Sequence, residues 1–297
     1  MMPYQTENEI SSFNLVNISS AAEREDGFAS ELCVAAEDIK PNLVDFEEVS
    51  AGALFDLKGL STIYAKNVNS QLHPASLTKV MTALVAMKNG TLDQMLTASD
   101  NVVITEAGAQ VCGLKAGDQM TLDQALHILL IYSANDVAVM IAENIGGSVE
   151  GFTQMMNEEA MRIGATGSHF LNPNGLTQDG HYVTAYDMYL IFNEALKFNS
   201  FSEIIQMSSY STVYYSQNGT EIPLEIDSTN LYLRGDYNSP GSVTVIGGKT
   251  GTTNAAGHCL ILYSKNSSGN PYISVVMNAP SREELYGHMT DLLGQIP

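Results

Sequence analysis

Hydrophobic and polar positions follow three successive patterns along the chain. Residues 49–67 (VSAGALFDLKGLSTIYAKN) contain two short apolar runs on either side of Lys58-Gly59, which predicts two strands joined by a turn. The last third contains three further runs of this kind, divided by turns with glycine or asparagine. We expect these strands at 243–253, 258–264 and 272–278.

The middle of the chain has helical spacing instead. After Pro74, apolar residues recur at i, i+3, i+4, i+7 and i+8, which predicts a core-facing helix ending at Lys88-Asn89-Gly90. Residues 94–120 are mixed and turn-rich, and 167–184 are irregular and rich in Asn and Gly. Further helices are expected at 121–132, 136–147, 149–163 and 184–198, with a last one opened by the capping-box pattern of Ser281 and Glu284.

The order of these elements predicts an α+β fold. Strands come first, then a helix-rich middle, then strands and a closing helix, with no internal repeat. We expect an antiparallel sheet made from both chain ends and packed by terminal helices, beside an inserted all-helical subdomain. A cleft between two such halves is a natural place for a site.

Charge narrows the classes of function. The net charge is −20, from 13 basic and 33 acidic residues, so no basic stripe is available for nucleic acid or for an anionic membrane surface. Residues 1–50 hold 11 acidic and 2 basic residues. We expect residues 1–28 to form an acidic, poorly ordered arm, and 29–297 to form the folded domain. No apolar run reaches membrane-spanning length, and MMPYQTENEI lacks the order of a secretion signal, which leaves a cytoplasmic chain or a removed export signal.

Metal and cofactor chemistry has no support in the sequence. The three cysteines lie far apart, without a C-x-x-C pair, and the six histidines form no tight ligand pair. We therefore expect no metal and no cofactor. The cysteines are Cys33, Cys112 and Cys259.

Two polar residues stand on the apolar helix after Pro74. Ser76 and Lys79 share a face because they are three residues apart, and only small residues follow on that face. Serine needs a base within hydrogen-bond reach, and a lysine serves only if burial or a second cation lowers its pKa. Taken alone, this S-x-x-K more often marks a capping serine and a solvated lysine.

Two more short motifs bear on that choice. GGKTGTT (247–253) places Lys249 and three threonines in a glycine-flanked strand, where either a bulge or a close approach by a ligand is the explanation. S-x-N occurs seven times. By letters alone SDN at 99 is the best candidate, but SAN at 133 is the polar break between two apolar helices, so burial directs its polar groups inward. We select Ser133 and Asn135.

S-x-x-K, S-x-N and K-T-G in this order strongly resemble the penicillin-recognising serine acyltransferases. Within them, PASLTKVMTAL, YAKN, NPNGLTQDGHYVTAYDM and SREELYGHMTDLL look like the low-molecular-mass D-Ala-D-Ala carboxypeptidases, over about residues 50–295. The resemblance implies a β-lactamase/transpeptidase-like fold. It also implies an acyl-enzyme on Ser76, with Lys79 as base and Ser133 relaying a proton to the departing D-alanine.

The resemblance extends to substrate and location. It implies stem peptides of peptidoglycan ending in D-Ala-D-Ala as substrates, β-lactams as acylating inhibitors, and an extracytoplasmic site of action, with the export signal absent from this sequence. The further β domain and anchoring helix common in the family are absent too, so we expect no membrane contact from this chain; oligomeric state is left open. The resemblance also implies which residues bind the substrate. Asn135 would hold an amide, Thr250 and Arg282 would receive the terminal carboxylate, and Lys249 and Gly251 of K-T-G would belong to the same binding site. The N–H groups of Thr252 and Ser76 would bind the oxyanion.

Three other functions compete with this one. A class A β-lactamase carries an E-x-x-L-N loop for deacylation, and none lies between Asn135 and Lys249, so slow deacylation is expected. K-T-G and NPNGL argue against a serine glutaminase. A penicillin sensor or wall-binding module would not turn over D-Ala-D-Ala peptides. His169 and His181 flank NPNGL, and we expect His181 and Tyr182 to brace this loop.

Overall fold

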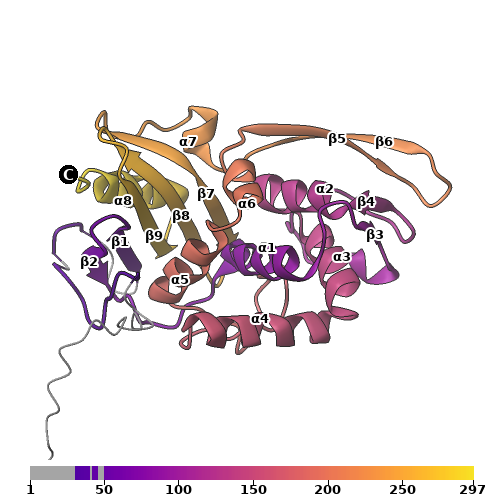
Figure 1. The fold of residues 1–297 in the computed structure, drawn as a ribbon, viewed down its shortest axis with the longest axis horizontal. Helices are drawn as coiled ribbons and strands as arrows, with labels where there is room; N and C mark the ends of the chain where they lie inside the picture. The colour runs from indigo at the N-terminus through magenta and orange to yellow at the C-terminus, as the bar shows by residue number, and fades with distance from the viewer. Residues whose placement is uncertain (1–30, 41, 46–49) are drawn as a thin grey trace, which may run out of the picture. The chain divides into compact units, whose positions relative to one another are not determined.

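A five-stranded antiparallel sheet joins the two ends of the folded chain (Figure 1). The computed structural model describes residues 31–40, 42–45 and 50–297, so the acidic arm expected at 1–28 lies outside the described residues. All elements below belong to the unit Leu32–Pro297. The strand order confirms the prediction of a sheet from both chain ends: β2 (Ser61–Lys66), β1 (Ala51–Asp56), β9 (Pro271–Ala279), β8 (Gly257–Asn266) and β7 (Val243–Thr253).

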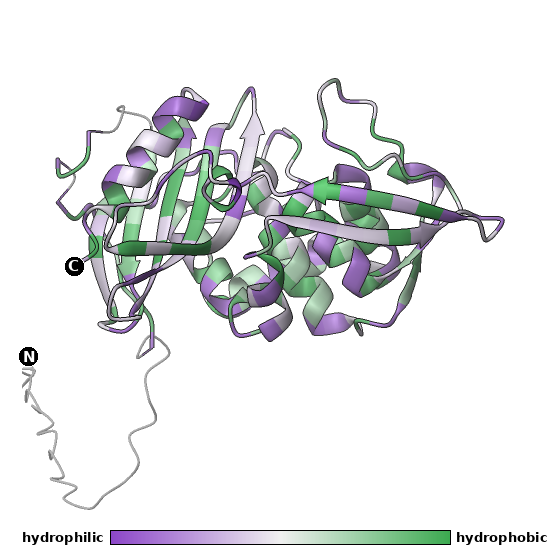
Figure 2. Cartoon of the chain, turned by 90° about the horizontal axis from the view of Figure 1, so that it is seen from above, coloured by the Kyte–Doolittle hydropathy of each residue, from purple (hydrophilic) through white to green (hydrophobic). Residues whose placement is uncertain are grey.

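Each face of this sheet is buried by helices. The closing helix α8 (Arg282–Leu293) packs on β8 and β9 over an apolar cluster that includes Leu260 and Val276. On the opposite face α5 (Ala185–Ala195) contacts β1 and β9, and Tyr189 stacks on Phe55 at 4.1 Å between ring centroids. Because both faces are covered, the central strands are mostly hydrophobic, as Figure 2 shows.

The helical part lies beside the sheet and surrounds α1 (Thr78–Asn89). This helix contacts α3, α4 and α5, so nearly its whole surface is buried. The predicted helices are confirmed, with α4 at the expected bounds. Within the described ranges, no helix is long and apolar enough to cross a membrane. The remaining helical bounds are α2 (Leu122–His127), the π-helical turn η3 (Ile128–Tyr132), α3 (Asn135–Gly146), α4 (Val149–Ile163), α6 (Asn199–Ile204) and α7 (Leu231–Arg234).

A second, four-stranded sheet was not predicted as such. Its order is β3 (Met95–Thr97), β4 (Gln119–Thr121), β5 (Ser209–Tyr215) and β6 (Glu221–Asp227). β5 covers most of the Tyr-rich run YSTVYYS (210–216), whose alternation fits an amphipathic strand. β6 alternates exposed and half-buried residues around Pro223, a weak signal for a strand in the absence of its partner.

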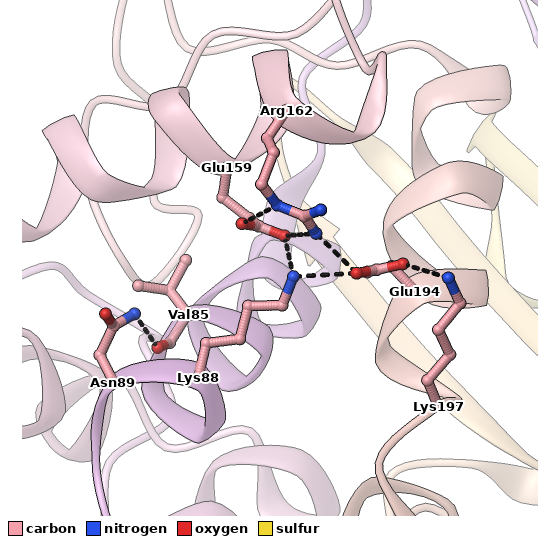
Figure 3. A network of polar contacts seen from close by, with 7 residues as sticks. All are labelled: Val85, Lys88, Asn89, Glu159, Arg162, Glu194 and Lys197. Carbon is pink, nitrogen blue, oxygen red and sulfur yellow. Dashed lines mark hydrogen bonds and ion pairs between the residues drawn. The ribbon is translucent and has the colours of Figure 1, made fainter. Parts of the chain in front are cut away.

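A network of charges ties three helices together on the side of α1 shown in Figure 3. Lys88 at the end of α1 donates to Glu159 on α4 (2.6 Å) and to Glu194 on α5 (2.9 Å). Arg162 bridges the same two carboxylates, and Lys197 pairs with Glu194 at 2.8 Å. Both carboxylates are largely buried, so each depends on its cations.

We expect Glu194→Gln to destabilise the fold in a pH-dependent way. Burial by itself raises the pKa of Glu194, but hydrogen bonds from Lys197, Lys88 and Arg162 outweigh it and lower the pKa from 4.5 to about 2. The stabilisation is therefore present above about pH 4.5 and is lost as the pH falls towards 2. Urea unfolding should show a deficit of about 2 kcal/mol near neutral pH and a smaller one near pH 3.

The matched control for this experiment is Glu203→Gln, which changes an exposed glutamate on α6. It should leave the free energy of unfolding almost unchanged. An equal deficit for Glu194→Gln at both pH values would show that the ionised carboxylate is not what stabilises this region.

Candidate active site

Ser76 lies in a tight turn before the central helix. The 3₁₀ turn η1 (Ala75–Leu77) precedes α1, so Ser76 and Lys79 lie three residues apart across the junction of a 3₁₀ and an α-helical turn. Side chains at this spacing are neighbours in an α-helix and eclipse one another in a 3₁₀ turn. Ala75 has a left-handed φ of 48°, a conformation that costs energy for a residue with a side chain and is often found at functional sites.

Lys79 is fully buried beneath Ser76. Its Nζ lies 2.9 Å from Ser76 Oγ, 2.8 Å from Asn135 Oδ1 and 2.7 Å from the carbonyl oxygen of Asn174. Burial lowers the pKa of Lys79 well below its ordinary value, and the charge of Lys249 lowers it further, whereas Asp136 acts in the opposite direction. The hypothesis of a buried rather than solvated lysine is therefore confirmed by the structure.

A second serine and lysine form the other side of the site. Ser133 occupies the break between η3 and α3, with a left-handed φ of 71°. Lys249 on β7 is 1% exposed, and its Nζ donates to Ser133 Oγ and to the Thr250 carbonyl oxygen, both at 2.9 Å. Burial lowers the pKa of Lys249 to about 7.

The choice of SAN at 133 over SDN at 99 agrees with the geometry. Asn135 bonds to Lys79 through Oδ1, and its Nδ2 donates to the Gln110 carbonyl oxygen at 3.0 Å. Ser99 instead caps the 3₁₀ turn η2 (Asp100–Val102) and donates to Glu143 Oε2 at 2.6 Å. The 99–101 tripeptide thus has its own bonding pattern on the far end of α3.

Two glycines let separate segments approach the turn at Ser76. A Cβ on Gly251 of β7 would lie 2.9 Å from the Ser76 backbone nitrogen. One on Gly175, in the NPNGL stretch, would lie 1.8 Å from the Ala75 carbonyl oxygen, and φ there is +84°. The glycine of K-T-G therefore serves a close approach of two backbones rather than a bulge.

These groups meet at one pocket of about 750 Å³. Thr250 Oγ1 lies 2.6 Å from Thr229 Oγ1, and Thr252 Oγ1 lies 3.2 Å from His258 Nδ1. Arg282 is exposed at the first residue of α8. The two lysines lie beneath the pocket, and the other seven predicted site residues line it: Ser76, Ser133, Asn135, Thr250, Gly251, Thr252 and Arg282.

His181 holds the NPNGL stretch, as expected for a bracing residue. Its Nδ1 accepts from the Leu171 N–H at 3.2 Å, which leaves Nε2 to donate to Thr78 Oγ1 at 3.0 Å. Burial, with smaller effects of His73 and His169, lowers its pKa to about 4. His181 is therefore neutral near pH 7 and fixes the loop that carries the Asn174 carbonyl.

Sequence reasoning missed several groups at the site. The carbonyl oxygens of Asn174 and Gln110 bond to the predicted side chains, but a backbone atom leaves no residue-type signal. Thr229, two residues before α7, and His258 of β8 also line the pocket. His258 follows the K-T-G strand after a short turn, as in a β-hairpin. Its pairing opposite Thr252 could therefore have been predicted from the register of the two strands.

Comparison with known proteins shows the class of fold and the family of this chain. The chain matches a solved Streptomyces DD-transpeptidase with a TM-score of 0.77 and 24% identity, over 85% of this chain and 98% of that one. A sequence model of the Peptidase S11 family, described as D-alanyl-D-alanine carboxypeptidase, matches residues 43–281. This chain belongs to that family.

Curated relatives agree with this assignment. The D-alanyl-D-alanine carboxypeptidase DacF of Bacillus subtilis is 35% identical over 251 residues, which are 83% of this chain and 61% of that protein. A D-alanyl-D-alanine carboxypeptidase of Mycobacterium tuberculosis is 35% identical over 203 residues, covering 68% of this chain and 65% of that protein. The chain thus spans less than two thirds of the length of these relatives.

Proposed function

We propose that this protein is an extracytoplasmic serine carboxypeptidase that removes the terminal D-alanine from peptidoglycan stem peptides and is acylated by β-lactams. The observation that carries this proposal is the buried Lys79 amine, 2.9 Å from the hydroxyl of a pocket-lining serine. Family membership and the DD-peptidase fold support the substrate class.

The bonding of Lys79 suits a general base. A neutral amine has two N–H donors and one lone pair. The two donors match the two carbonyl oxygens, Asn135 Oδ1 and Asn174 O, which can only accept. The lone pair is then left for the Ser76 hydroxyl, whose proton Lys79 removes as Oγ attacks the peptide carbonyl.

The remaining steps follow from the positions of the other groups. The tetrahedral oxyanion accepts hydrogen bonds from the N–H groups of Ser76 and Thr252. Ser133, held by Lys249, passes a proton to the amine of D-alanine as the C–N bond breaks. Water then attacks the ester carbonyl, its hydroxyl group goes to the acyl product, and its proton restores the Ser76 hydroxyl.

Substrate binding is assigned to the pocket wall. Asn135 holds a substrate amide, and Gly251 lets the substrate backbone run beside β7. Thr250 and Arg282 receive the terminal carboxylate, since both line the pocket and Arg282 carries an exposed guanidinium.

The function is tested with two substrates of the same enzyme. We expect intact-protein mass spectrometry to show a single benzylpenicillin adduct that persists for hours, and a peptide ending in D-Ala-D-Ala to release D-alanine. Rapid drug hydrolysis without an adduct would identify a β-lactamase. A stable adduct without D-alanine release would identify a sensor, and either result overturns the proposal.

A further inference from the structure

Asp136 is a buried carboxylate directly beside Asn135, in the first turn of α3. It is 1% exposed and accepts hydrogen bonds from the backbone N–H groups of Gly113 (2.8 Å), Leu114 (3.1 Å) and Cys112 (3.2 Å). It also accepts from the N–H of Val137 at 3.0 Å. Hydrogen bonds to an ionised acceptor are strong, and a carboxylate is favoured in the first turn of a helix. Asp136 therefore fastens the segment 112–114 to α3.

The backbone of this segment is shaped to receive the carboxylate. Three consecutive N–H groups converge on Asp136, as in the concave anion sites formed by successive backbone amides. Gly113, at the centre, has a φ of +87°. A Cβ there would meet nothing within 4 Å, so glycine is required for its backbone conformation and not for space.

The same loop holds the active-site amide. The carbonyl oxygen of Gln110 accepts from both the backbone N–H (2.8 Å) and Nδ2 (3.0 Å) of Asn135. Since a carbonyl oxygen accepts and cannot donate, this pairing turns Nδ2 towards the loop and leaves Oδ1 facing Lys79 Nζ. Residues 110–114, here called the Gln110–Leu114 clamp, thus grip two neighbouring residues of α3, and Asp136 is the residue that fastens the clamp.

Asp136 also bears on the charge of the site. Lys79 and Lys249 are both buried, and the positive charge of Lys249 disfavours the protonated form of Lys79. The charge of Asp136 raises the pKa of Lys79, against the lowering by burial and by Lys249. No step of the proposed mechanism uses the Asp136 carboxylate, although its charge affects the protonation of Lys79, the proposed base.

We propose that Asp136 is a positioning residue of the acylation reaction, which fastens the Gln110–Leu114 clamp so that Asn135 faces Lys79, and whose negative charge opposes the effect of the Lys249 charge on Lys79. This inference rests on the proposed function, because it takes Lys79 as the base that activates Ser76. It assigns to Asp136 two separable effects, one on geometry and one on charge.

The test is the rate of acylation by a fluorescent penicillin, measured as a function of pH for the full chain and for Asp136→Asn. Loss of the carboxylate weakens the clamp, so we expect the plateau of the second-order rate constant to fall roughly tenfold. Loss of the negative charge lowers the pKa of Lys79 further, so the amine stays neutral to lower pH. The acid limb of the profile should therefore move to lower pH.

Two further variants separate the two effects. Gly113→Ala keeps the charge but strains the clamp through its positive φ, so it should lower the plateau without moving the acid limb. Glu143→Gln is the matched control, because Glu143 is a carboxylate on the same helix that ties Ser99 and Asn101 to α3. It should change neither the plateau nor the limb.

The outcomes distinguish this inference from the proposed function. If the unmodified protein is not acylated, the proposed function fails. If the unmodified protein is acylated and the folded Asp136→Asn variant has the same plateau and the same acid limb, the role of Asp136 is overturned. If the plateau is lower but the acid limb does not move, the proposed effect of the Asp136 charge on Lys79 is overturned. Should Asp136→Asn not fold, as judged by thermal unfolding, Gly113→Ala carries the test, and an unchanged plateau in that variant overturns the clamp.

Discussion

Ser76→Ala is expected to lose penicillin acylation and D-alanine release altogether, because the hydroxyl that forms the ester is gone. Residual turnover should lie at least about 10³-fold below that of the unmodified protein. The variant should stay folded, since Ser76 is only half-buried and Lys79 keeps its bonds to Asn135 and Asn174. Intact mass after benzylpenicillin, D-alanine release and thermal unfolding measure the three quantities.

The matched control for this variant is Ser99→Ala. Ser99 begins the rival S-x-N tripeptide and bonds to Glu143 away from the pocket lining, so its loss should leave labelling intact. A full benzylpenicillin adduct on folded Ser76→Ala would place the nucleophile on another residue. The proposed mechanism would then be wrong, although the fold assignment would stand.

Local periodicity was enough to predict the helix that carries Lys79 but not the burial of this lysine. The apolar stripe after Pro74 fits a helix with either a solvated or a buried lysine, because a stripe describes only the face that carries it. Burial of Lys79 is completed by Asn135 and Asn174, which lie 56 and 95 residues further along the chain. Motif order supplied the missing information, since K-T-G and S-x-N have a purpose only if they meet S-x-x-K.

The burial argument and the letters of the motif favour different S-x-N tripeptides, and the geometry agrees with the burial argument. SDN at 99 is the better match by letters, but Ser133 lies between two apolar helices, and a polar break there has to find partners inside the protein. The structure gives it Lys249. The partner of Asn135 Nδ2 could not be predicted in the same way, because it is the carbonyl oxygen of Gln110, in a segment recognisable only as turn-rich.

The second sheet shows a different limit. β6 pairs with β5 along its full length, but its outward positions are polar or proline, and two of its three inward positions, Ile222 and Leu224, are only half-buried. Such a strand has a weak hydrophobic signal and is stabilised by cross-strand pairing that no single segment reveals. The core strands β8 and β9, buried on both faces, were predicted from their continuous apolar runs.

Lys79→Ala is expected to lower the acylation rate about 10³-fold while the protein stays folded, because general-base catalysis contributes about that much. Lys249 cannot take over as base, since its Nζ is bonded to Ser133 Oγ and to the Thr250 carbonyl oxygen and is not a partner of Ser76. The small cavity left by the substitution is lined by the two carbonyl oxygens that Lys79 had bound, so a water molecule can satisfy them.

Lys88→Ala provides the opposite result on the same helix. Lys88 pairs with Glu159 and Glu194 at the far end of α1, so its loss should lower the free energy of unfolding and leave the acylation rate unchanged. Lys79→Ala should do the reverse. Burying an amine costs free energy, so its removal has little net effect on stability, whereas the acylation rate stays low at every pH. If folded Lys79→Ala is acylated with the pH profile of the unmodified protein, the base that activates Ser76 is a different group.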